Sequence, residues 1–405
     1  MIREAFSALR HRNYLLLWCG TLLSNTGDKI DQLALNWLVF EMTGSAYYLA
    51  LVNICRGLPI VIFTLIGGAF ADRAERRSMM VVTQTCAMIL ALLLAILVAT
   101  GGAGIWMVMM VAVARGTVFA FNLPTRQSLI SELVPRQDLA NAIALNSLTM
   151  NTTKVLGPAL AGVIIASFGT AVCFFINGLS FVVVLATLLA MRFPEAQVVI
   201  SETRPGIASS ILEGLVFVRQ DKVVLMLLLV AMVPTFFGQP VVTLLVLYVH
   251  EVFLVGAEGL GLLTACTAAG SVIGAFVLAA RSRQTIRGFA MMVWLVLFGV
   301  ALFVFGLNTV YAIAPLILIV AGVAQVSYTA SNNTLLQLRL PDHLRGRVLS
   351  IMLLNRALVP FGAAAAAGLA AMVGAPLAMV TFGAIIVVFA ALILLLYPRM
   401  RNLRS

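Results

Sequence analysis

Long apolar runs, each able to cross a bilayer as a helix, fill most of this sequence, and the loops between them alternate in charge. The arginines gather in every second loop and at both ends of the chain. The intervening loops contain no Lys or Arg, near Thr43, Gly102, Gly169, Gly256, Asn308 and Gly374. Because basic residues are retained on the cytoplasmic side of a membrane, the alternation predicts a multi-pass helical protein with both termini in the cytoplasm.

Composition agrees with a membrane protein and excludes two other classes. Of the 405 residues, 62% are apolar and 10% are charged, whereas a soluble domain has about 25% charged residues. A transmembrane β-barrel would show alternating segments of about 10 residues, which the unbroken apolar runs lack. Most of the basic residues behind the net charge of +11 lie in the loops, so the charge reflects membrane insertion and predicts no nucleic-acid partner.

The apolar runs predict twelve spans, divided by one long polar break. The break, residues 193–222, contains Pro194, Pro205 and charges of both signs, and a surface amphipathic helix is predicted at 207–218. We therefore expect an all-α fold of two six-helix bundles, residues 1–192 and 223–405, joined by the linker 193–222. The predicted spans are 14–40, 46–71, 78–100, 105–124, 138–168, 171–192, 223–249, 258–280, 288–306, 310–335, 347–373 and 376–397.

The two halves carry a faint internal repeat. Leu133–Leu139 (LVPRQDL) resembles Leu338–Leu344 (LRLPDHL), and with one gap Gly157 falls opposite Gly362. Two six-span repeats joined by a linker are typical of one large class of secondary transporters.

The first span carries charges at mid-depth, at Asp28, Lys29 and Asp31. A charge in lipid costs roughly 2.5–3.5 kcal/mol or more, so these residues must face protein or water. Lys29 is expected to point away from the polar stripe, and Asp31 to lie beside it. The residues that share this stripe, at three- and four-residue steps, are Asn25, Asp28, Gln32 and Asn36.

Two interpretations of the acids remain open. Both can be permanently paired, with Arg115 and Arg56, as scaffold. Alternatively one of them exchanges protons, because burial disfavours the ionised carboxylate and a movable arginine favours it. Asp28 is preferred because it lies on the polar stripe.

Basic residues outnumber the acids at membrane depth, with Arg56, Arg115, Lys154 and Arg356 in addition to Lys29. If they face a cavity, they predict a substrate with carboxylate, catecholate or phosphate groups. The alternative is that Lys154 and Arg56 pair only with Asp31 or with backbone carbonyls. Arg126 is assigned to the basic loop after the fourth span.

The loop after the second span resembles motif A of the major facilitator superfamily, Gly-x-x-x-Asp-Arg-x-Gly-Arg-Arg. The resemblance implies that Asp72 bridges to the neighbouring half and locks one conformation, although the arginines also serve as topology anchors. Glu75 replaces the usual glycine, which is similar to the branch of macrolide and enterobactin exporters, proton antiporters for drugs and siderophores. The matching residues are Gly68, Asp72, Arg73, Arg76 and Arg77.

Three further segments resemble the same family. Arg115-Gly116 looks like the arginine of motif B, and Gly157–Gly162 (GPALAG) resembles the core of motif C in proton-driven exporters, without its upstream glycines. Pro158 then either helps to set the direction of antiport or is a simple kink. Leu340–Val348 resembles a loop of the exporter branch. The resemblance implies the major facilitator fold, with the first, fourth, seventh and tenth spans lining a central cavity and Asp28 or Asp31 near Arg115.

Further polar residues are weaker candidates for substrate contact: Gln239, Gln325, Tyr328 and Asn332. Each can equally be an interhelical contact. The five cysteines lie in apolar spans without a CxxC spacing, so packing is expected of them. We expect no cofactor or metal, and a small-molecule substrate, protons and lipids as the partners of a monomer.

These features favour a transporter over an enzyme, because the sequence has no nucleophile or metal constellation. It also has no Walker loop, so ATP is not the expected energy source and the transporter is expected to be a secondary one. The favoured function is proton-coupled efflux of a small amphiphilic or anionic compound, drug- or siderophore-like, by alternating access across the bacterial cytoplasmic membrane. A multidrug antiporter fits this description. The alternative is import or facilitated movement of a metabolite or lipid by the same fold.

Overall fold

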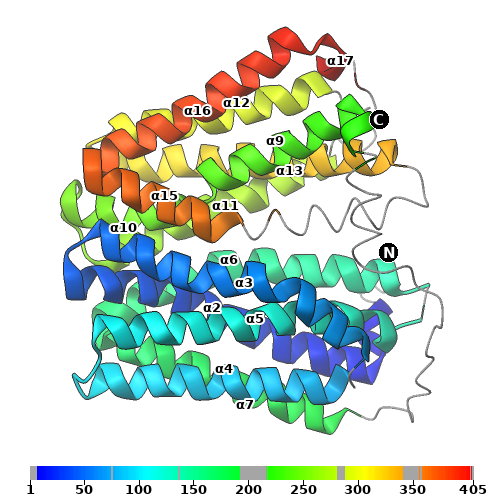
Figure 1. Cartoon of the computed structure of the whole chain (residues 1–405), viewed down its shortest axis with the longest axis vertical. Coiled ribbons are helices and arrows are strands. Elements are labelled where there is room, and N and C mark those ends of the chain that lie inside the picture. Colours follow the sequence, from blue (N-terminus) through cyan, green and yellow to red (C-terminus); the bar gives the residue numbers. More distant parts are fainter. Residues whose placement is uncertain are drawn as a thin grey trace. The chain divides into compact units, whose positions relative to one another are not determined.

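The computed structural model describes residues 7–73, 76–135, 137–191, 216, 218–280, 288–340, 355, 358–401 and 403. Within these residues the chain is helical and contains no strand, as Figure 1 shows. The all-α fold is therefore confirmed. Two compact units can be distinguished: unit 1 comprises Met1–Gly44 and Ile54–Glu202, and unit 2 comprises Ser45–Asn53 and Thr203–Ser405.

Unit 1 begins with a short 3-10 helix, η1 (Ser7–Arg10), and continues with long α-helices. With 32 residues, the first long helix rises about 48 Å, which exceeds the ~30 Å hydrocarbon core and leaves Asp28 near its middle. The start of the second, up to Asn53, groups with unit 2. The helices are α2 (Arg12–Thr43), α3 (Ala46–Arg73), α4 (Arg76–Ala99), α5 (Ile105–Leu133), α6 (Leu139–Phe168) and α7 (Thr170–Ala190).

Unit 2 holds the remaining described helices. They are α9 (Lys222–Gly238), α10 (Val241–Glu251), α11 (Ala257–Ala280), α12 (Gly288–Leu307), η2 (Tyr311–Ile313), α13 (Ala314–Arg339), α15 (Leu358–Val373), α16 (Ala375–Leu396) and α17 (Pro398–Arg401). Of the surface helix predicted at 207–218, only Val216 and Val218 are described, and both are helical. The rest of that segment lies outside the described residues.

Ten spans of the described chain are long and apolar enough to cross a membrane. In this set α9 and α10 together form one span, Lys222–Glu251. Two further helices occupy predicted spans: α2, which is long but carries the charged residues, and α15, whose 16 described residues are apolar. The chain is thus a multi-pass membrane protein, with helices in the order that the sequence predicts.

The seventh span departs from the prediction of one continuous helix over 223–249. α9 ends at Gly238 and α10 begins at Val241, with Gln239 and Pro240 between them. Because Pro240 has no N–H to donate to the Phe236 carbonyl four residues earlier, the helix is interrupted there. A Cβ at Gly362 of α15 would collide with that same carbonyl oxygen, so the glycine allows α15 to pack on the interruption.

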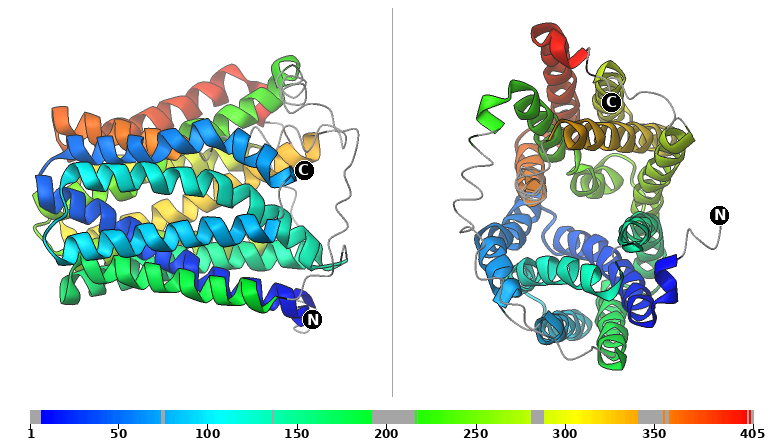
Figure 2. Two further views of the ribbon diagram at one scale, coloured as in Figure 1. Left: turned by 60° about the horizontal axis from the view of Figure 1, so that its bottom comes forward. Right: turned by 90° about the vertical axis from the view of Figure 1, so that its right-hand side faces the viewer.

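The two units repeat one internal arrangement. Their helices run broadly along one direction within each unit, as the two views of Figure 2 show. In unit 1 α6 packs on α2, where Gly157 lies against the Cβ of Lys29; in unit 2 α15 packs on α9, where Gly362 lies against Phe236. The sequence repeat that aligns Gly157 with Gly362 therefore has a counterpart in the packing of each unit.

A polar cluster outside the apolar spans ties the start of α2 to the start of α6. Ser7 Oγ donates to Asp138 Oδ1 at 2.6 Å, and His11 Nε2 lies 2.8 Å from Asp138 Oδ2. Nearby, the Tyr14 hydroxyl donates to the Ala142 carbonyl at 2.8 Å. The hydrogen bonds from Ser7 and then His11 hold the pKa of Asp138 below its ordinary value.

Gly157→Ala is expected to destabilise the protein by about 1–3 kcal/mol, because the new Cβ overpacks the contact between α6 and α2. Gly368→Ala is the matched control. Gly368 is also helical, but a Cβ there meets nothing within 4 Å, so that change should stabilise by roughly 0.5–1 kcal/mol. Thermal unfolding in detergent measures both, and equal effects of the two substitutions would contradict the close contact.

Asp138→Asn is expected to lower the melting temperature at neutral pH. The folded-state pKa of Asp138 is depressed, so its contribution is present above the unfolded-state value of about 3.9 and is lost as the pH falls through the folded-state value. The difference from the wild type should be full at pH 7 and should vanish in acid. Glu41→Gln, at an exposed position of α2, is the control and should leave the melting temperature at pH 7 unchanged.

Candidate functional site

The candidate site is built on the middle of α2, which is held on one side by α6 and α7 and approaches α5 on another. Ser24, Gly27, Ile30 and Asp31 are buried along it. This packing fixes the rotation of α2 about its axis. The acids of the charged stretch are thereby directed toward arginines of α3 and α5.

Asp31 and Arg115 form a buried ion pair between α2 and α5. Arg115 Nη1 donates to Asp31 Oδ1 at 2.7 Å and to Oδ2 at 2.6 Å. The two side chains are only 13% and 5% exposed, for Arg115 and Asp31 respectively. The expected proximity of the first-span acids to Arg115 is therefore observed, and it is Asp31 that makes the contact.

Asp28 is placed differently from Asp31, although it lies less than one turn away. It is half-buried, and among the described residues it has no hydrogen bond and no ion pair. Its electrostatic neighbours are Arg115, Asp31, Arg56 and Arg126. Asp28 is thus an unpaired acid among three cations, one of which is already engaged with Asp31.

Arg126 belongs to this site, and its assignment to a loop was wrong. The fourth span extends as α5 to Leu133, and Arg126 Nη1 donates to Asn25 Oδ1 at 3.0 Å. The apolar run weakens near Pro124, which made the span look complete. A usable signal was the spacing: Arg115 and Arg126 are eleven residues apart, about three helical turns, so they share one face of α5.

The other predicted residues of unit 1 lie around this centre. Arg56 is half-buried on α3 and has no ion pair within the described chain. Lys29 turns toward α6, and its Nζ donates to Gln32 Oε1 at 2.9 Å. Asn36 is buried, whereas Lys154 is exposed on α6, one turn before Gly157.

The candidates of unit 2 are uncharged. Tyr328 and Asn332 are buried on α13, and the Tyr328 ring lies 5.8 Å, centroid to centroid, from that of Phe298. Gln325 is half-buried, and Gln239 is exposed at the interruption of the seventh span. Arg356 lies outside the described residues.

Corresponding positions of the two units differ in charge. Gly116 of α5 lies against the Arg56 carbonyl, and Gly322 of α13 lies in the same way against the Thr267 carbonyl. The helices α9, α11 and α13 carry ionisable Lys, Arg, Asp or Glu residues only near their ends, at Lys222, Glu258 and Arg339. In the described chain, the charged centre is therefore a property of unit 1.

The motif residues lie at two places. Gly68, Asp72 and Arg73 lie in the last turns of α3, and Arg76 and Arg77 begin α4. Arg77 donates to the Leu189 carbonyl in the last turn of α7 at 3.2 Å, which satisfies a free helix-end acceptor. The side chains of the other four motif A residues lie outside what is described. The motif C pair, Gly157 and Pro158, is buried in α6.

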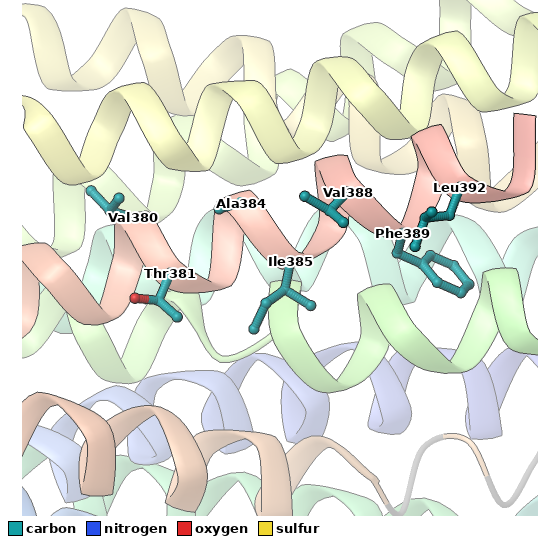
Figure 3. Close-up of a pocket in the computed structure, with 7 residues that line it drawn as sticks. All are labelled: Val380, Thr381, Ala384, Ile385, Val388, Phe389 and Leu392. Atoms are coloured by element: carbon teal, nitrogen blue, oxygen red, sulfur yellow. The ribbon is translucent and has the colours of Figure 1, made fainter. Parts of the chain in front are cut away.

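One groove of about 520 Å³ lies on unit 2, and it is not a polar site. It is lined by residues of one face of α16, which Figure 3 shows. The single hydroxyl there, on Thr381, donates to the Leu377 carbonyl of its own helix. An apolar face of this kind suits contact with lipid.

Repeated helical units in a membrane, with a buried acid–arginine pair and a second acid beside it, define the class of secondary transporters. The chain belongs to the transmembrane secretion effector family of the major facilitator superfamily, whose model matches residues 3–405. It is a transporter and not an enzyme.

Three relatives are similar over most of their length. The staphyloferrin A transporter of Staphylococcus aureus is 26% identical over 339 residues, 83% of this chain and 84% of the relative. Macrolide efflux protein A of Streptococcus pyogenes is 23% identical over 340 residues, 84% of each chain. The multidrug efflux pump Tap of Mycolicibacterium fortuitum is 26% identical over 355 residues, 84% of each chain.

A solved structure shows the same fold. A bacterial homologue of the human lysosomal transporter Spinster, in an inward-facing, occupied conformation, superposes with a TM-score of 0.75 over 96% of this chain and 98% of its own. The identity is 16%. The expected major facilitator fold is thereby confirmed.

Asp31→Asn is expected to destabilise the protein by about 3–5 kcal/mol, because it leaves the buried Arg115 without its counter-ion. Asp28→Asn is the matched control and should cost far less, since it breaks no ion pair. Adding Arg115→Gln to Asp31→Asn should recover part of the loss, which a double-mutant cycle of thermal unfolding measures. A loss for Asp28→Asn as large as that for Asp31→Asn would contradict the assigned pairing.

Proposed function

We propose that this transporter exports a small amphiphilic or anionic compound in exchange for protons, by alternating access. It acts in the bacterial cytoplasmic membrane, with its basic loops and both termini in the cytoplasm. The relatives support export, because two of them are named as efflux proteins, for macrolides and for multiple drugs. The alternation of basic loops supports the orientation.

The observation that carries the proposal is the difference between the two acids. Asp31 is locked in a buried ion pair, so a proton there would have to break the contact with Arg115. Asp28 has no such partner among the described residues, and it can gain or lose a proton while the Asp31–Arg115 pair stays formed. We therefore assign proton exchange to Asp28 and a fixed scaffold role to Asp31–Arg115.

Coupling follows from electrostatics. Partial burial disfavours the ionised carboxylate of Asp28, while the arginines around it favour that form. A movement that changes the distance between Asp28 and the arginines of α3 or α5 therefore changes the relative stability of its ionised and protonated forms. Protonation of Asp28 then depends on conformation, which is the requirement for exchanging protons against a substrate.

The charge balance supports a substrate with acidic groups. Three arginines surround two acids, and Arg115 is neutralised directly by Asp31. Arg56, half-buried and without an ion pair in the described chain, is the group that we assign to an acidic substituent of the substrate. A staphyloferrin A transporter is among the relatives, and this compound is accordingly the first probe to use beside a macrolide.

The test uses purified protein in proteoliposomes with an acidic lumen. Wild-type protein should accumulate radiolabelled macrolide or staphyloferrin A in the lumen as protons leave. Asp28→Asn should reduce accumulation to the level of protein-free liposomes, because the exchanging carboxyl is gone, while counterflow of labelled against unlabelled substrate should persist.

Glu41→Gln on the exposed end of α2 is the control and should transport like the wild type. Gradient-driven accumulation that survives in both Asp28→Asn and Asp31→Asn would overturn proton coupling at this site. Substrate that enters the lumen together with protons, instead of as protons leave, would identify an importer.

A further inference from the structure

The amide of Asn25 has one bonded end and one unbonded end. Its Oδ1 accepts from Arg126 Nη1 at 3.0 Å. A guanidinium can only donate, so the orientation of the amide is fixed and the oxygen cannot exchange places with the nitrogen. Asn25 Nδ2 is buried and has no hydrogen-bond partner. A buried donor without an acceptor is unfavourable, so this nitrogen points to a missing acceptor.

Asp28 is an acceptor about one helical turn from Asn25. Asn25 lies three residues before Asp28 on α2, and Asp31 lies three residues after it, so each step along the axis is about 4.5 Å. Residues three apart are neighbours on a helix surface. The carboxylate of Asp28, which lacks a partner among the described residues, is therefore within rotamer reach of Asn25 Nδ2.

The two arginines of α5 converge on Asp28. Arg115 and Arg126 are eleven residues apart, about 16 Å along α5, whereas their partners Asp31 and Asn25 are about 9 Å apart along α2. Both side chains must therefore reach toward each other to make their observed contacts. Asp28 lies between these two contacts.

The charged groups around Asp28 are accounted for. They are Asp31 on α2, Arg56 on α3, and Arg115 and Arg126 on α5. Lys29 turns to Gln32 on the α6 side, Lys154 of α6 is exposed, and Cys173 of α7 is an electrostatic neighbour of Asp31. Arg115 is already bonded to Asp31. Arg126 is bonded to Asn25, which lies one helical turn from Asp28, and it is therefore the α5 arginine to consider for Asp28.

We propose that Asn25 and Arg126 are positioning residues that receive the ionised carboxylate of Asp28. In this state Asn25 Nδ2 and the Arg126 guanidinium donate to Asp28. When one proton binds a carboxylate oxygen, the charge is removed and the side chain leaves the two donors. The Asp31–Arg115 pair stays formed throughout. The inference rests on the proposed function, since it takes Asp28 as the proton-exchanging acid.

The experiment is an infrared pH titration of the full-length protein in nanodiscs, without substrate. The C=O stretch of protonated Asp28 is assigned by its loss in Asp28→Asn. Arg126→Gln should move the midpoint of that band upward by about one pH unit, a tenfold gain in proton affinity, because a cation next to a carboxylate favours its ionised form by this amount or more. Arg126→Lys keeps the charge and should move the midpoint less.

Asn25→Ala is the second variant. It removes the amide donor but no charge, so it should raise the midpoint of the Asp28 band. This variant also tests the proposal if Arg126→Gln does not fold. Arg339→Gln, which removes an exposed arginine paired with Asp221 in unit 2, is the control and should leave the midpoint unchanged.

The outcomes separate the two proposals. The positioning role is overturned if the midpoint stays at the wild-type value in both Arg126→Gln and Asn25→Ala while Asp28→Asn still removes the band. Proton exchange at Asp28 would then remain intact. If Asp28→Asn removes no titrating band, proton exchange at Asp28 itself fails.

Discussion

The buried ion pair of Asp31 with Arg115 is the interaction on which the centre of unit 1 depends. A charge in the middle of a membrane is costly, and at 2.6–2.7 Å each member of the pair offsets part of the cost of the other. The pair also fixes the facing of α2 toward α5. Because Asp31 satisfies Arg115, Asp28 is left as an acid without a direct partner in the described chain. One contact thus gives two chemically identical carboxylates different surroundings, one of them paired and the other not.

Close backbone contact is what allows that arrangement to form. Gly157 lets α6 lie against α2 at Lys29, beside the charged stretch, and Gly116 lets α5 lie against the backbone of Arg56. Van der Waals packing of small residues is the main force that joins helices in lipid, where no hydrophobic effect acts between them. The glycines of motifs B and C therefore serve this close packing. They bring the charged helices together.

The two repeated units differ in the charge of their equivalent positions. Gly157 and Gly362 occupy equivalent contacts, as do Gly116 and Gly322, but Thr267 stands where unit 1 has Arg56. The seventh span is interrupted at Pro240 and carries no charged residue at that point. The same backbone plan thus carries a charged centre in one unit and a neutral, amide- and aromatic-containing surface in the other. This asymmetry is consistent with proton exchange in one unit and with uncharged substrate contacts in the other.

The sequence by itself determined the class, the number and order of the spans, and the charged residues of the first span. Apolar length and loop charge act locally along the chain, so they can be read without a structure. The break of the seventh span at Pro240 also has a local cause, the missing N–H of a proline. Only the tertiary structure decided that Asp31 and not Asp28 pairs with Arg115, and that Arg126 reaches Asn25. Side-chain pairing depends on how neighbouring helices are rotated and how closely they approach. Those quantities are set by packing between segments about 80 to 100 residues apart, and no local pattern encodes them.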